Sequence, residues 1–299
     1  MNLTRTQFDI LIFLEQRNDS ENLTQKEIAL AVGHSTETTI EETINHLKEE
    51  GLIANNNLTD AGKNTLEPYR VKRAVFIAAG FGSRLVPITF NTPKPLVRVN
   101  GVRIIDTLLD AVCAAGIGEI IIVRGYLSEQ FDQLKYKYPN IQFLENPIYN
   151  ESNNISSAMC ARFLLQNAYV LESDLLLKKP ALISKYQYTS NYLGVPVELT
   201  DDWCFETRDK IITRLKVGGT NCHHMFGISF WNQTDGAKLA EHIKQVYQMP
   251  GGKERYWDQV ALEYFVKDYA VEVRECSFDD IVEIDTLNEL RNIDENYRL

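Results

Sequence analysis

Cysteine and histidine are scarce in this sequence, with five of each among 299 residues. The cysteines are scattered and form no C-x-x-C pair, and the histidines form neither H-x3-H nor H-E-x-x-H. Structural zinc sites and zinc peptidases depend on such spacings, and small disulfide-rich folds depend on even sets of cysteines. The sequence therefore argues against both classes, and we expect reduced thiols in the cytoplasm.

Long apolar runs are also absent from the sequence. No stretch approaches the roughly 20 apolar residues that a helix needs to cross a bilayer. The second residue is already polar, which is unlike a signal peptide. We expect no membrane partner. Wholesale disorder is excluded as well, because 44% hydrophobic and 10% aromatic residues are enough to form a core.

Positive charge is scarce relative to negative charge, and the imbalance is uneven along the chain. The sequence holds 31 Lys and Arg against 41 Asp and Glu, a net charge of −10. Residues 1–70 carry 6 basic and 12 acidic side chains, a net charge of −6, although they form less than a quarter of the chain. The length favours two domains, and we expect them at residues 1–70 and 71–299.

Residues 1–70 have the pattern of three short helices followed by a small hairpin. Apolar residues recur at helical spacing within residues 8–14, 28–32 and 40–47. Two short strands around a turn are expected at residues 52–59, and the run LTDAGKNTL resembles a wing. This order is typical of a winged helix-turn-helix, so we expect a small winged-helix domain before the main one.

The acidity of this segment argues against DNA binding. Its expected recognition helix, residues 36–50, carries five glutamates against one lysine, Lys48. Contacts with bases and phosphates favour Arg, Lys, Asn and Gln instead. DNA binding through the N-terminal domain stays an alternative. We favour a scaffold that supports a homodimer or packs on the main domain.

Residues 71–299 alternate between apolar strands and helical segments. We expect strands at 73–79, 119–123, 141–144 and 168–171, and helices at 104–115, 127–136 and 156–165. Such alternation predicts an α/β fold with a Rossmann-like, doubly wound and mostly parallel sheet. Ligands of these sheets bind at the carboxyl ends of the strands, where this sequence carries its polar motifs.

A glycine-rich turn after the first expected strand has the chemistry of a triphosphate-binding loop. In the run A-A-G-F-G-S-R-L the candidate nucleotide-binding residues are Ala78, Ala79, Gly80, Gly82 and Ser83. Glycines let backbone N–H groups approach phosphate oxygens closely, and Arg84 and Lys94 add cationic contacts. Leu85 replaces the third glycine of G-x-G-x-x-G, and G-x-x-x-x-G-K-S/T is absent. We therefore expect neither a dinucleotide-binding fold nor a P-loop ATPase.

This run, continued by P-K-P at residues 93–95, resembles the signature of the nucleotidyltransferases that activate sugar 1-phosphates and related phosphates. Within that family it is similar to the bacterial CTP:phosphocholine cytidylyltransferases, from residue 73 to about residue 290. The other matching pieces are VRGYLSEQFDQL, NPIYNESNNISSA, ESD, GISFW, RYWD and VEIDT. The resemblance implies the nucleotidyltransferase fold, CTP and phosphocholine as substrates, and Mg²⁺ as the cofactor.

Two aspartates at the ends of apolar stretches are the candidate metal ligands. Asp174 follows the strand expected at 168–171, and Asp285 ends the apolar stretch in VEIDT. Carboxylate oxygens are hard ligands that suit Mg²⁺ beside phosphates, and the resemblance implies the same pair. Family members often carry Asp two positions before the first ligand, whereas this chain has Glu172. The role of Glu172 stays open.

Asn153, Asn154 and Ser157 form a polar run just before an expected helix. Amides can donate to and accept from a pyrimidine edge, and a helix start adds free N–H groups. Helix capping is the alternative role for each residue. The resemblance favours contacts with the base and ribose of the nucleotide.

Aromatic residues near acids are candidates for binding the acceptor. All three tryptophans lie in the last hundred residues, and aromatic faces with a nearby carboxylate bind quaternary ammonium groups. We expect Trp231 in the core. The candidate acceptor-binding residues are Asp202, Trp203, Tyr256, Trp257 and Asp258. Phosphoethanolamine or an aminoalkylphosphonate would also fit such a pocket.

These observations predict an enzyme that forms CDP-choline and pyrophosphate from CTP and phosphocholine. Its candidate catalytic residues are Arg84 and Lys94, which would stabilise the departing pyrophosphate, and Asp174, which would hold Mg²⁺ together with Asp285. One alternative is a nucleotidyltransferase for phosphoethanolamine, an aminoalkylphosphonate or a sugar 1-phosphate. The other is a transcription regulator whose transferase-like domain senses a nucleotide.

Overall fold

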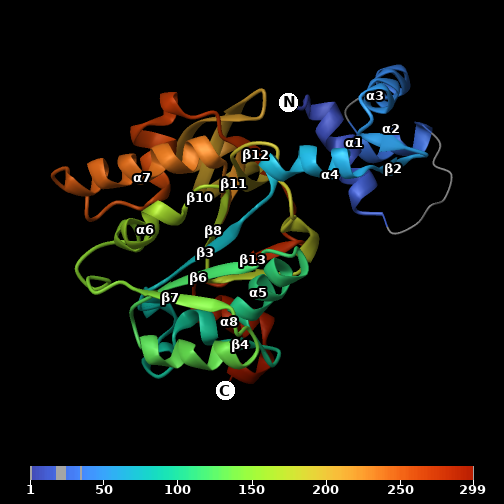
Figure 1. Ribbon diagram of the computed structural model, residues 1–299. Helices are drawn as coiled ribbons and strands as arrows, with labels where there is room; N and C mark the ends of the chain where they lie inside the picture. Colours follow the sequence, from blue (N-terminus) through green and yellow to red (C-terminus); the bar gives the residue numbers. More distant parts are fainter. Residues whose placement is uncertain (1, 18–24, 34–35, 299) are drawn as a thin grey trace. The chain divides into compact units, whose positions relative to one another are not determined.

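The computed structural model describes residues 2–17, 25–33 and 36–298 (Figure 1). The chain divides into two compact units, Met1–Arg70 and Val71–Leu299. Among the described residues, no helix is both long and apolar enough to cross a membrane.

The N-terminal unit consists of helices and one short hairpin. Its elements are α1 (Arg5–Glu15), α2 (Gln25–Val32), α3 (Glu37–Glu49), β1 (Ile53–Ala54), β2 (Asn57–Leu58) and α4 (Asp60–Leu66). The Thr4 and Thr36 side chains cap α1 and α3 by accepting backbone N–H groups that the helix itself leaves unbonded. Leu11 of α1 and Ile40 of α3 are both fully buried.

The run LTDAGKNTL differs from the wing that it resembles in sequence. Most of it forms α4, because the Thr59 side chain accepts the Gly62 N–H and caps that helix. A Cβ at Gly62 would lie 2.2 Å from the Leu52 carbonyl oxygen, so glycine allows α4 to pack directly on the segment before β1. The expected hairpin is present, with Ile53 opposite Leu58.

Seven strands of the C-terminal unit form one sheet in the order β10-β12-β11-β8-β3-β6-β7 (Figure 1). They are β3 (Arg73–Ala78), β6 (Glu119–Arg124), β7 (Ile141–Glu145), β8 (Ala168–Glu172), β10 (Asn191–Arg208), β11 (Ile211–Trp231) and β12 (Glu272–Glu275). The central strands β8, β3, β6 and β7 are parallel, whereas β11 runs antiparallel to β8. The predicted α/β class with a mostly parallel central sheet is confirmed.

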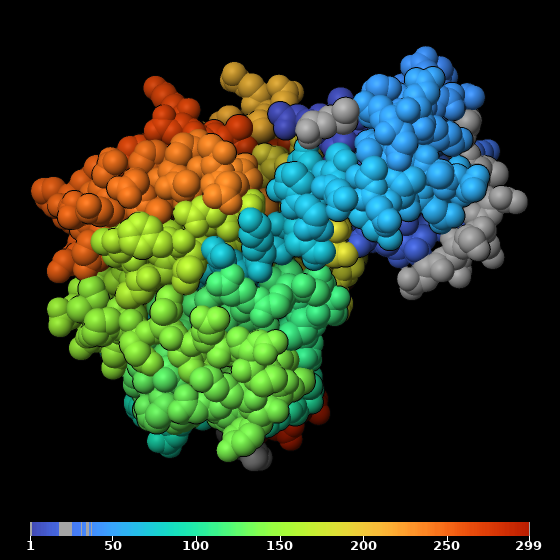
Figure 2. All heavy atoms as spheres, viewed as in Figure 1, coloured from blue at the N-terminus to red at the C-terminus, as the bar shows by residue number. Residues whose placement is uncertain are grey.

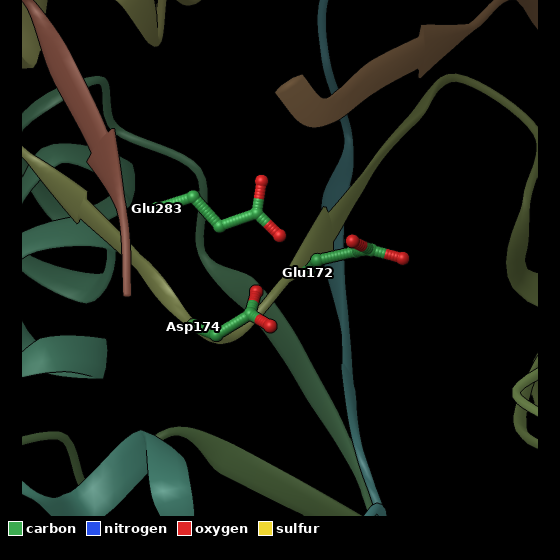
Figure 3. A group of neighbouring side chains, drawn as sticks. All are labelled: Glu172, Asp174 and Glu283. Atoms are coloured by element: carbon green, nitrogen blue, oxygen red, sulfur yellow. The ribbon is translucent and has the colours of Figure 1, made fainter. Parts of the chain in front are cut away.

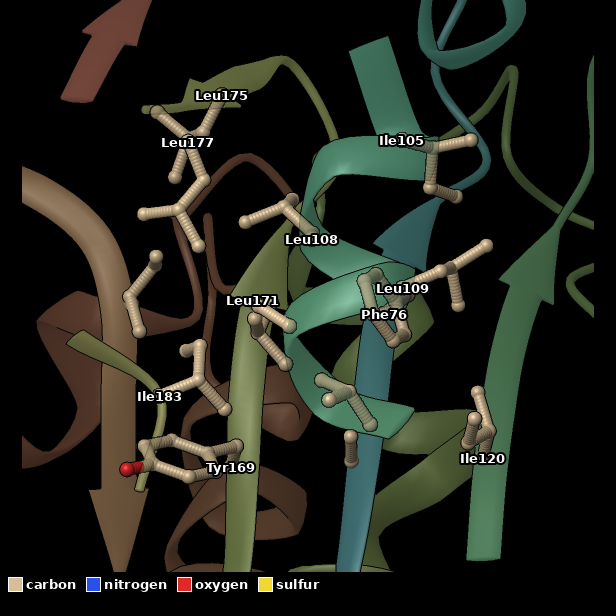
Figure 4. Packing of buried hydrophobic residues seen from close by; sticks show 14 of the residues in the cluster. Phe76, Ile105, Leu108, Leu109, Ile120, Tyr169, Leu171, Leu175, Leu177 and Ile183 are labelled. Carbon is tan, nitrogen blue, oxygen red and sulfur yellow. The ribbon is translucent and has the colours of Figure 1, made fainter. Parts of the chain in front are cut away.

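Helices cover both faces of this sheet, namely α5 (Ile104–Ala114) on one face and α6 (Ile155–Ala161) with α7 (Gln233–Gln248) on the other. Successive residues of a strand point to opposite faces. Phe76 of β3 therefore packs in the cluster of α5 with Leu108 (Figure 4), while Val75 belongs to the cluster of α6 and α7. Helices α6 and α7 lie side by side, yellow-green and orange in Figures 1 and 2.

Shorter elements complete the unit. They are β4 (Arg98–Val99), β5 (Val102–Arg103), β9 (Leu175–Leu177), β13 (Ile281–Glu283) and α8 (Leu287–Ile293). The helix expected at 127–136 is a 3₁₀ helix, Ser128–Tyr136, and the one expected at 156–165 ends as an α-helix at Ala161. The antiparallel pairing of β9 with β13 brings the C-terminal segment to the end of β8.

Strands β10 and β11 form a long antiparallel ribbon. Residues 191–194 pair with β12 and residues 228–231 pair with β8, whereas the residues between pair mainly with one another. The register shifts between Thr200 and Trp203, as it does at a β-bulge. Such an irregularity redirects side chains, and Trp203 lines the cavity described next.

Candidate active site

A cavity of about 440 Å³ opens at the carboxyl ends of β3 and β8. Nearly all predicted site residues line it: Ala78, Ala79, Gly80, Gly82, Ser83, Arg84, Lys94, Asn153, Asn154, Ser157, Asp174, Asp202, Trp203, Tyr256, Asp258 and Asp285. They come from segments that are far apart in the sequence. The fold brings them together because β3 and β8 are parallel neighbours and β13 lies against β9.

Gly82 shapes the loop that follows β3. Its φ of +63° lies in the left-handed region, and a Cβ there would approach the Lys94 Cβ to 2.9 Å and the Thr89 Cγ2 to 3.1 Å. The Thr89 hydroxyl donates to the Gly82 carbonyl at 2.9 Å. Glycine is therefore required at this position for both conformation and space. At Gly80 the space around a Cβ is open, which leaves the backbone accessible.

Lys94 is the central cation of the cavity. Its side-chain Nζ lies 2.7 Å from Asp174 Oδ2 and 2.7 Å from Asp285 Oδ1, and the residue is only 8% exposed. Burial acts to lower the pKa of Lys94, but the charges of the two aspartates outweigh it and raise that pKa. Arg84 Nη1 reaches the other oxygen of Asp285 at 2.9 Å. The lysine is thus charged and bridges two acidic segments.

Three carboxylates gather beside this lysine. Oxygens of Glu172, Asp174 and Glu283 all lie within 4.8 Å of one another (Figure 3). Burial, together with the charges of Asp258 and Asp174, raises the pKa of Glu172 well above its ordinary value. Burial and the charges of Asp174 and Asp285 do the same for Glu283. Burial and mutual repulsion therefore oppose the ionisation of both glutamates.

The residues present fit a hard divalent cation. Carboxylate oxygens are the ligands that Mg²⁺ prefers. Asp174 Oδ1 is buried and has no hydrogen-bond partner within the described part of the chain, so this oxygen is available as a ligand atom. The predicted pair Asp174 and Asp285 is already joined through Lys94, and Glu283 adds a carboxylate that the sequence reasoning missed. The sequence could have indicated Glu283, because it lies two residues before Asp285 and residues at this spacing share one side of an extended segment.

Glu172, which differs from the usual aspartate, has a defined environment. Its Oε1 accepts a hydrogen bond from Asn154 Nδ2 at 3.2 Å. Gly227 of β11 provides room for the longer side chain, since a Cβ there would lie 2.6 Å from the Glu172 Cγ. The extra methylene is therefore accommodated by a glycine on the neighbouring strand.

The polar run before α6 is bonded mainly to protein. Asn154 Oδ1 accepts the Trp257 N–H at 2.9 Å, and Asn153 Nδ2 donates to the Glu254 carbonyl at 3.2 Å. Ser157 accepts a hydrogen bond from Asn146, a buried residue that the sequence reasoning missed. No side-chain cap is formed at the start of α6 by Asn154. The capping alternative for Asn154 is therefore excluded, and its contacts lie elsewhere.

An aromatic corner lies on another part of the cavity. The rings of Trp203 and Tyr256 meet edge to face with centroids 5.6 Å apart. Asp202 beside them is exposed, whereas Asp258 is 4% exposed and accepts a hydrogen bond from the Tyr192 hydroxyl. Burial raises the pKa of Asp258 to about 6. Aromatic faces and acids thus occur together, as the sequence predicts.

Trp257 differs from the prediction. It is 1% exposed and does not line the cavity; its ring packs against Tyr192 and Trp231 with centroids 6.3 Å and 6.1 Å away. Trp231 is fully buried in the same cluster, as expected for a core residue. The sequence places Tyr256 and Trp257 between the charged residues Arg255 and Asp258, and only the tertiary packing shows that the Trp257 ring faces the core.

Comparison with known proteins shows the following similarities. A family model described as nucleotidyl transferase matches residues 73–191. A 2-aminoethylphosphonate cytidylyltransferase of Lancefieldella rimae is 33% identical over 228 residues, which cover 75% of this chain and 92% of the relative. A choline-phosphate cytidylyltransferase of Streptococcus pneumoniae is 32% identical over 228 residues, covering 75% and 97%. One from Haemophilus influenzae is 30% identical over 224 residues, covering 74% and 95%.

Two solved structures are also similar to this chain. The CTP:phosphocholine cytidylyltransferase from Streptococcus pneumoniae superposes with a TM-score of 0.70 at 33% identity, covering 76% of this chain and 99% of that one. An inositol-1-phosphate CTP transferase from T. maritima shares the fold, with a TM-score of 0.59 at 15% identity over 77% of this chain and 94% of that one.

The crowded carboxylates predict a gain in stability from neutralising Glu283. Burial and the charges of Asp174 and Asp285 oppose the ionisation of Glu283, so Glu283→Gln should raise the melting temperature without divalent metal. A gain of about 1 kcal/mol corresponds to about 2–4 °C for a unit of this size. Differential scanning calorimetry measures the shift, with Glu198→Gln at an exposed position as the control. A lower melting temperature in Glu283→Gln would show that the carboxylate is stabilised by its neighbours.

Proposed function

The chain belongs to the nucleotidyltransferase family and is an enzyme of the cytidylyltransferase type, and on this basis we propose that it forms CDP-choline and pyrophosphate from CTP and phosphocholine. One observation carries the proposal: the glycine loop, the paired aspartates and the Trp203–Tyr256 corner line a single cavity. Both substrates can therefore meet within it. The five cysteines are free thiols, which supports the cytoplasm as the compartment.

The phosphates of CTP are assigned to the glycine loop. Backbone N–H groups of residues 78–83 can approach phosphate oxygens there, with Ser157 of α6 at the same cavity. Both cations line the cavity, Arg84 as an exposed side chain and Lys94 as a buried one. We assign to both the stabilisation of the negative charge that develops on the departing pyrophosphate.

The reaction needs no covalent enzyme intermediate. A phosphate oxygen of phosphocholine attacks the α-phosphorus of CTP in line, the bond from the α-phosphorus to the bridging oxygen breaks, and pyrophosphate leaves with the electron pair. The chain contributes mainly positioning and electrostatic stabilisation. Asp174 and Asp285 would hold Mg²⁺, with Glu283 beside them. When bound, that ion supplies neutralisation of phosphate charge.

The head group of the acceptor is assigned to the aromatic corner. A trimethylammonium group cannot donate hydrogen bonds, so aromatic faces and a nearby carboxylate are the groups that bind it. Trp203 and Tyr256 provide the faces, and Asp202 provides the exposed charge. Asp258 contributes from below the surface, where it is held by the Tyr192 hydroxyl.

A second acceptor, 2-aminoethylphosphonate, is favoured by a specific observation. The cavity contains Glu172, Asp202, Asp258 and Glu283, and a primary ammonium group can donate three hydrogen bonds to such carboxylates. The relative from Lancefieldella rimae is named a 2-aminoethylphosphonate cytidylyltransferase. Phosphoethanolamine presents the same ammonium group, whereas a sugar 1-phosphate presents no cation to these acids.

An acceptor panel tests the assignment. Pyrophosphate release is measured with CTP and, in turn, phosphocholine, phosphoethanolamine, 2-aminoethylphosphonate and glucose 1-phosphate. We expect the highest kcat/KM with phosphocholine, by about tenfold or more, because differential binding of the head group sets the discrimination. Asp174→Asn serves as the inactive control. A higher kcat/KM with 2-aminoethylphosphonate transfers the assignment to that acceptor, and release that persists in Asp174→Asn contradicts the proposed site.

Trp203→Ala should weaken binding of the acceptor without weakening binding of CTP. Loss of a cation–π contact of about 1–2 kcal/mol predicts a roughly 5- to 30-fold rise in the KM for phosphocholine. Steady-state kinetics with the other substrate saturating measures both KM values. Trp203→Phe, which keeps an aromatic face, should fall between wild type and Trp203→Ala. An equal rise in both KM values would count against the head-group assignment.

We also propose that the N-terminal unit is a winged-helix scaffold for self-association into a homodimer. Its order of helices and hairpin supports the winged-helix class. The exposed side of α3 carries Glu41 and Glu49, and such a surface is repelled by the phosphates of DNA. A scaffold role therefore fits the charge better than a role in DNA binding.

Deletion of residues 1–70 tests this proposal. The curated relatives match over 228 or 224 residues and are almost completely covered, so the shorter chain should keep its turnover. Analytical ultracentrifugation should show a dimer for the full chain and a monomer for the deletion variant. A gel-shift assay at low salt with the protein's own promoter region should show no binding. Tight and salt-sensitive binding would favour a nucleotide-sensing transcription regulator instead.

A further inference from the structure

Two loops at the cavity are joined by hydrogen bonds. The 152–154 loop precedes α6, and the 253–258 loop follows α7. The Asn153 N–H and the Ser152 hydroxyl both donate to the Lys253 carbonyl at 2.7 Å. Asn153 Nδ2 donates to the Glu254 carbonyl at 3.2 Å. These contacts are made by the protein alone, so they hold the loops together without a substrate.

Asn154 links this pair of loops to the sheet. Its Oδ1 accepts the Trp257 N–H at 2.9 Å, and its Nδ2 donates to Glu172 Oε1 at 3.2 Å. An amide suits this position because one end accepts and the other donates. Asn154 therefore connects the start of α6, the 253–258 loop and the end of β8.

Trp257 is consequently fixed at two points. Its ring is buried in the core, and its backbone N–H is held by Asn154. The residues on either side of it, Tyr256 and Asp258, both line the cavity. Because the backbone between them is fixed, the directions of these two side chains depend on the Asn154 contact.

We propose that Asn154 is a positioning residue for the acceptor: it sets the wall formed by Tyr256 and Asp258 through the backbone of Trp257. The nature of the acceptor rests on the proposed function, whereas the contact itself does not. A base-reading amide directs its donor and acceptor to the nucleotide. In Asn154 one N–H donor already bonds Glu172, and the oxygen already bonds the Trp257 N–H. The positioning role therefore differs from the nucleotide contact predicted from the sequence.

Kinetics of Asn154→Ala test the positioning role. Loss of two hydrogen bonds predicts a rise of about tenfold in the KM for phosphocholine, with little change in the KM for CTP. Ser152→Ala is the matched control, because it removes a hydrogen bond between the same loops without touching Trp257. The proposal is overturned if the KM for CTP rises as much as that for phosphocholine, or if Ser152→Ala produces the same split.

Hydrogen–deuterium exchange tests the contact independently of the acceptor. In the substrate-free protein, the Trp257 amide should exchange faster in Asn154→Ala than in wild type and unchanged in Ser152→Ala. Unchanged exchange in Asn154→Ala would refute the contact. If no acceptor supports turnover, the proposed function fails while this measurement still decides the contact. Should Asn154→Ala not fold, Asn154→Ser takes its place in both experiments.

Discussion

The site depends on one buried ammonium group that holds two carboxylates from segments far apart in the sequence of the C-terminal unit. Lys94 bonds Asp174 at the end of β8 and Asp285 after β13, each at 2.7 Å. Without this cation, the buried acids around it would repel one another and would have to take up protons. The lysine therefore makes it physically feasible to collect carboxylates at one edge of the sheet. Gly82, whose missing side chain leaves room for the Lys94 stem, is part of the same arrangement.

The fold was predictable because its signals are local. Strand β3 and its neighbours are apolar runs of strand length, and their alternation with helices determines a parallel sheet. The errors lie where tertiary contacts override the local pattern. Most of the run LTDAGKNTL folds into α4, where Gly62 packs against the Leu52 carbonyl. Residues 128–136 form a 3₁₀ helix instead of the expected α-helix. Neither outcome follows from hydrophobic periodicity.

The site was predictable where a residue type has one chemical use at its position. The glycine loop and Lys94 belong to this class, and both line the cavity. Prediction fails where orientation decides. Trp257 lies between two residues that line the cavity, yet its ring turns to the core. Asn154 has the chemistry to read a base, but hydrogen bonds to Trp257 and Glu172, distant in sequence, engage it. Such pairings are determined by tertiary packing.

The β10–β11 ribbon carries two residues of the proposed acceptor site on an element separate from the central strands. Asp202 and Trp203 lie on the ribbon, whereas Arg84, Lys94 and Asp174 follow strands of the central sheet. Under the proposed function, substitutions on the ribbon would alter the head-group contacts while the residues assigned to the phosphates keep their positions. Acceptor preference and transfer chemistry would then be separable by substitution.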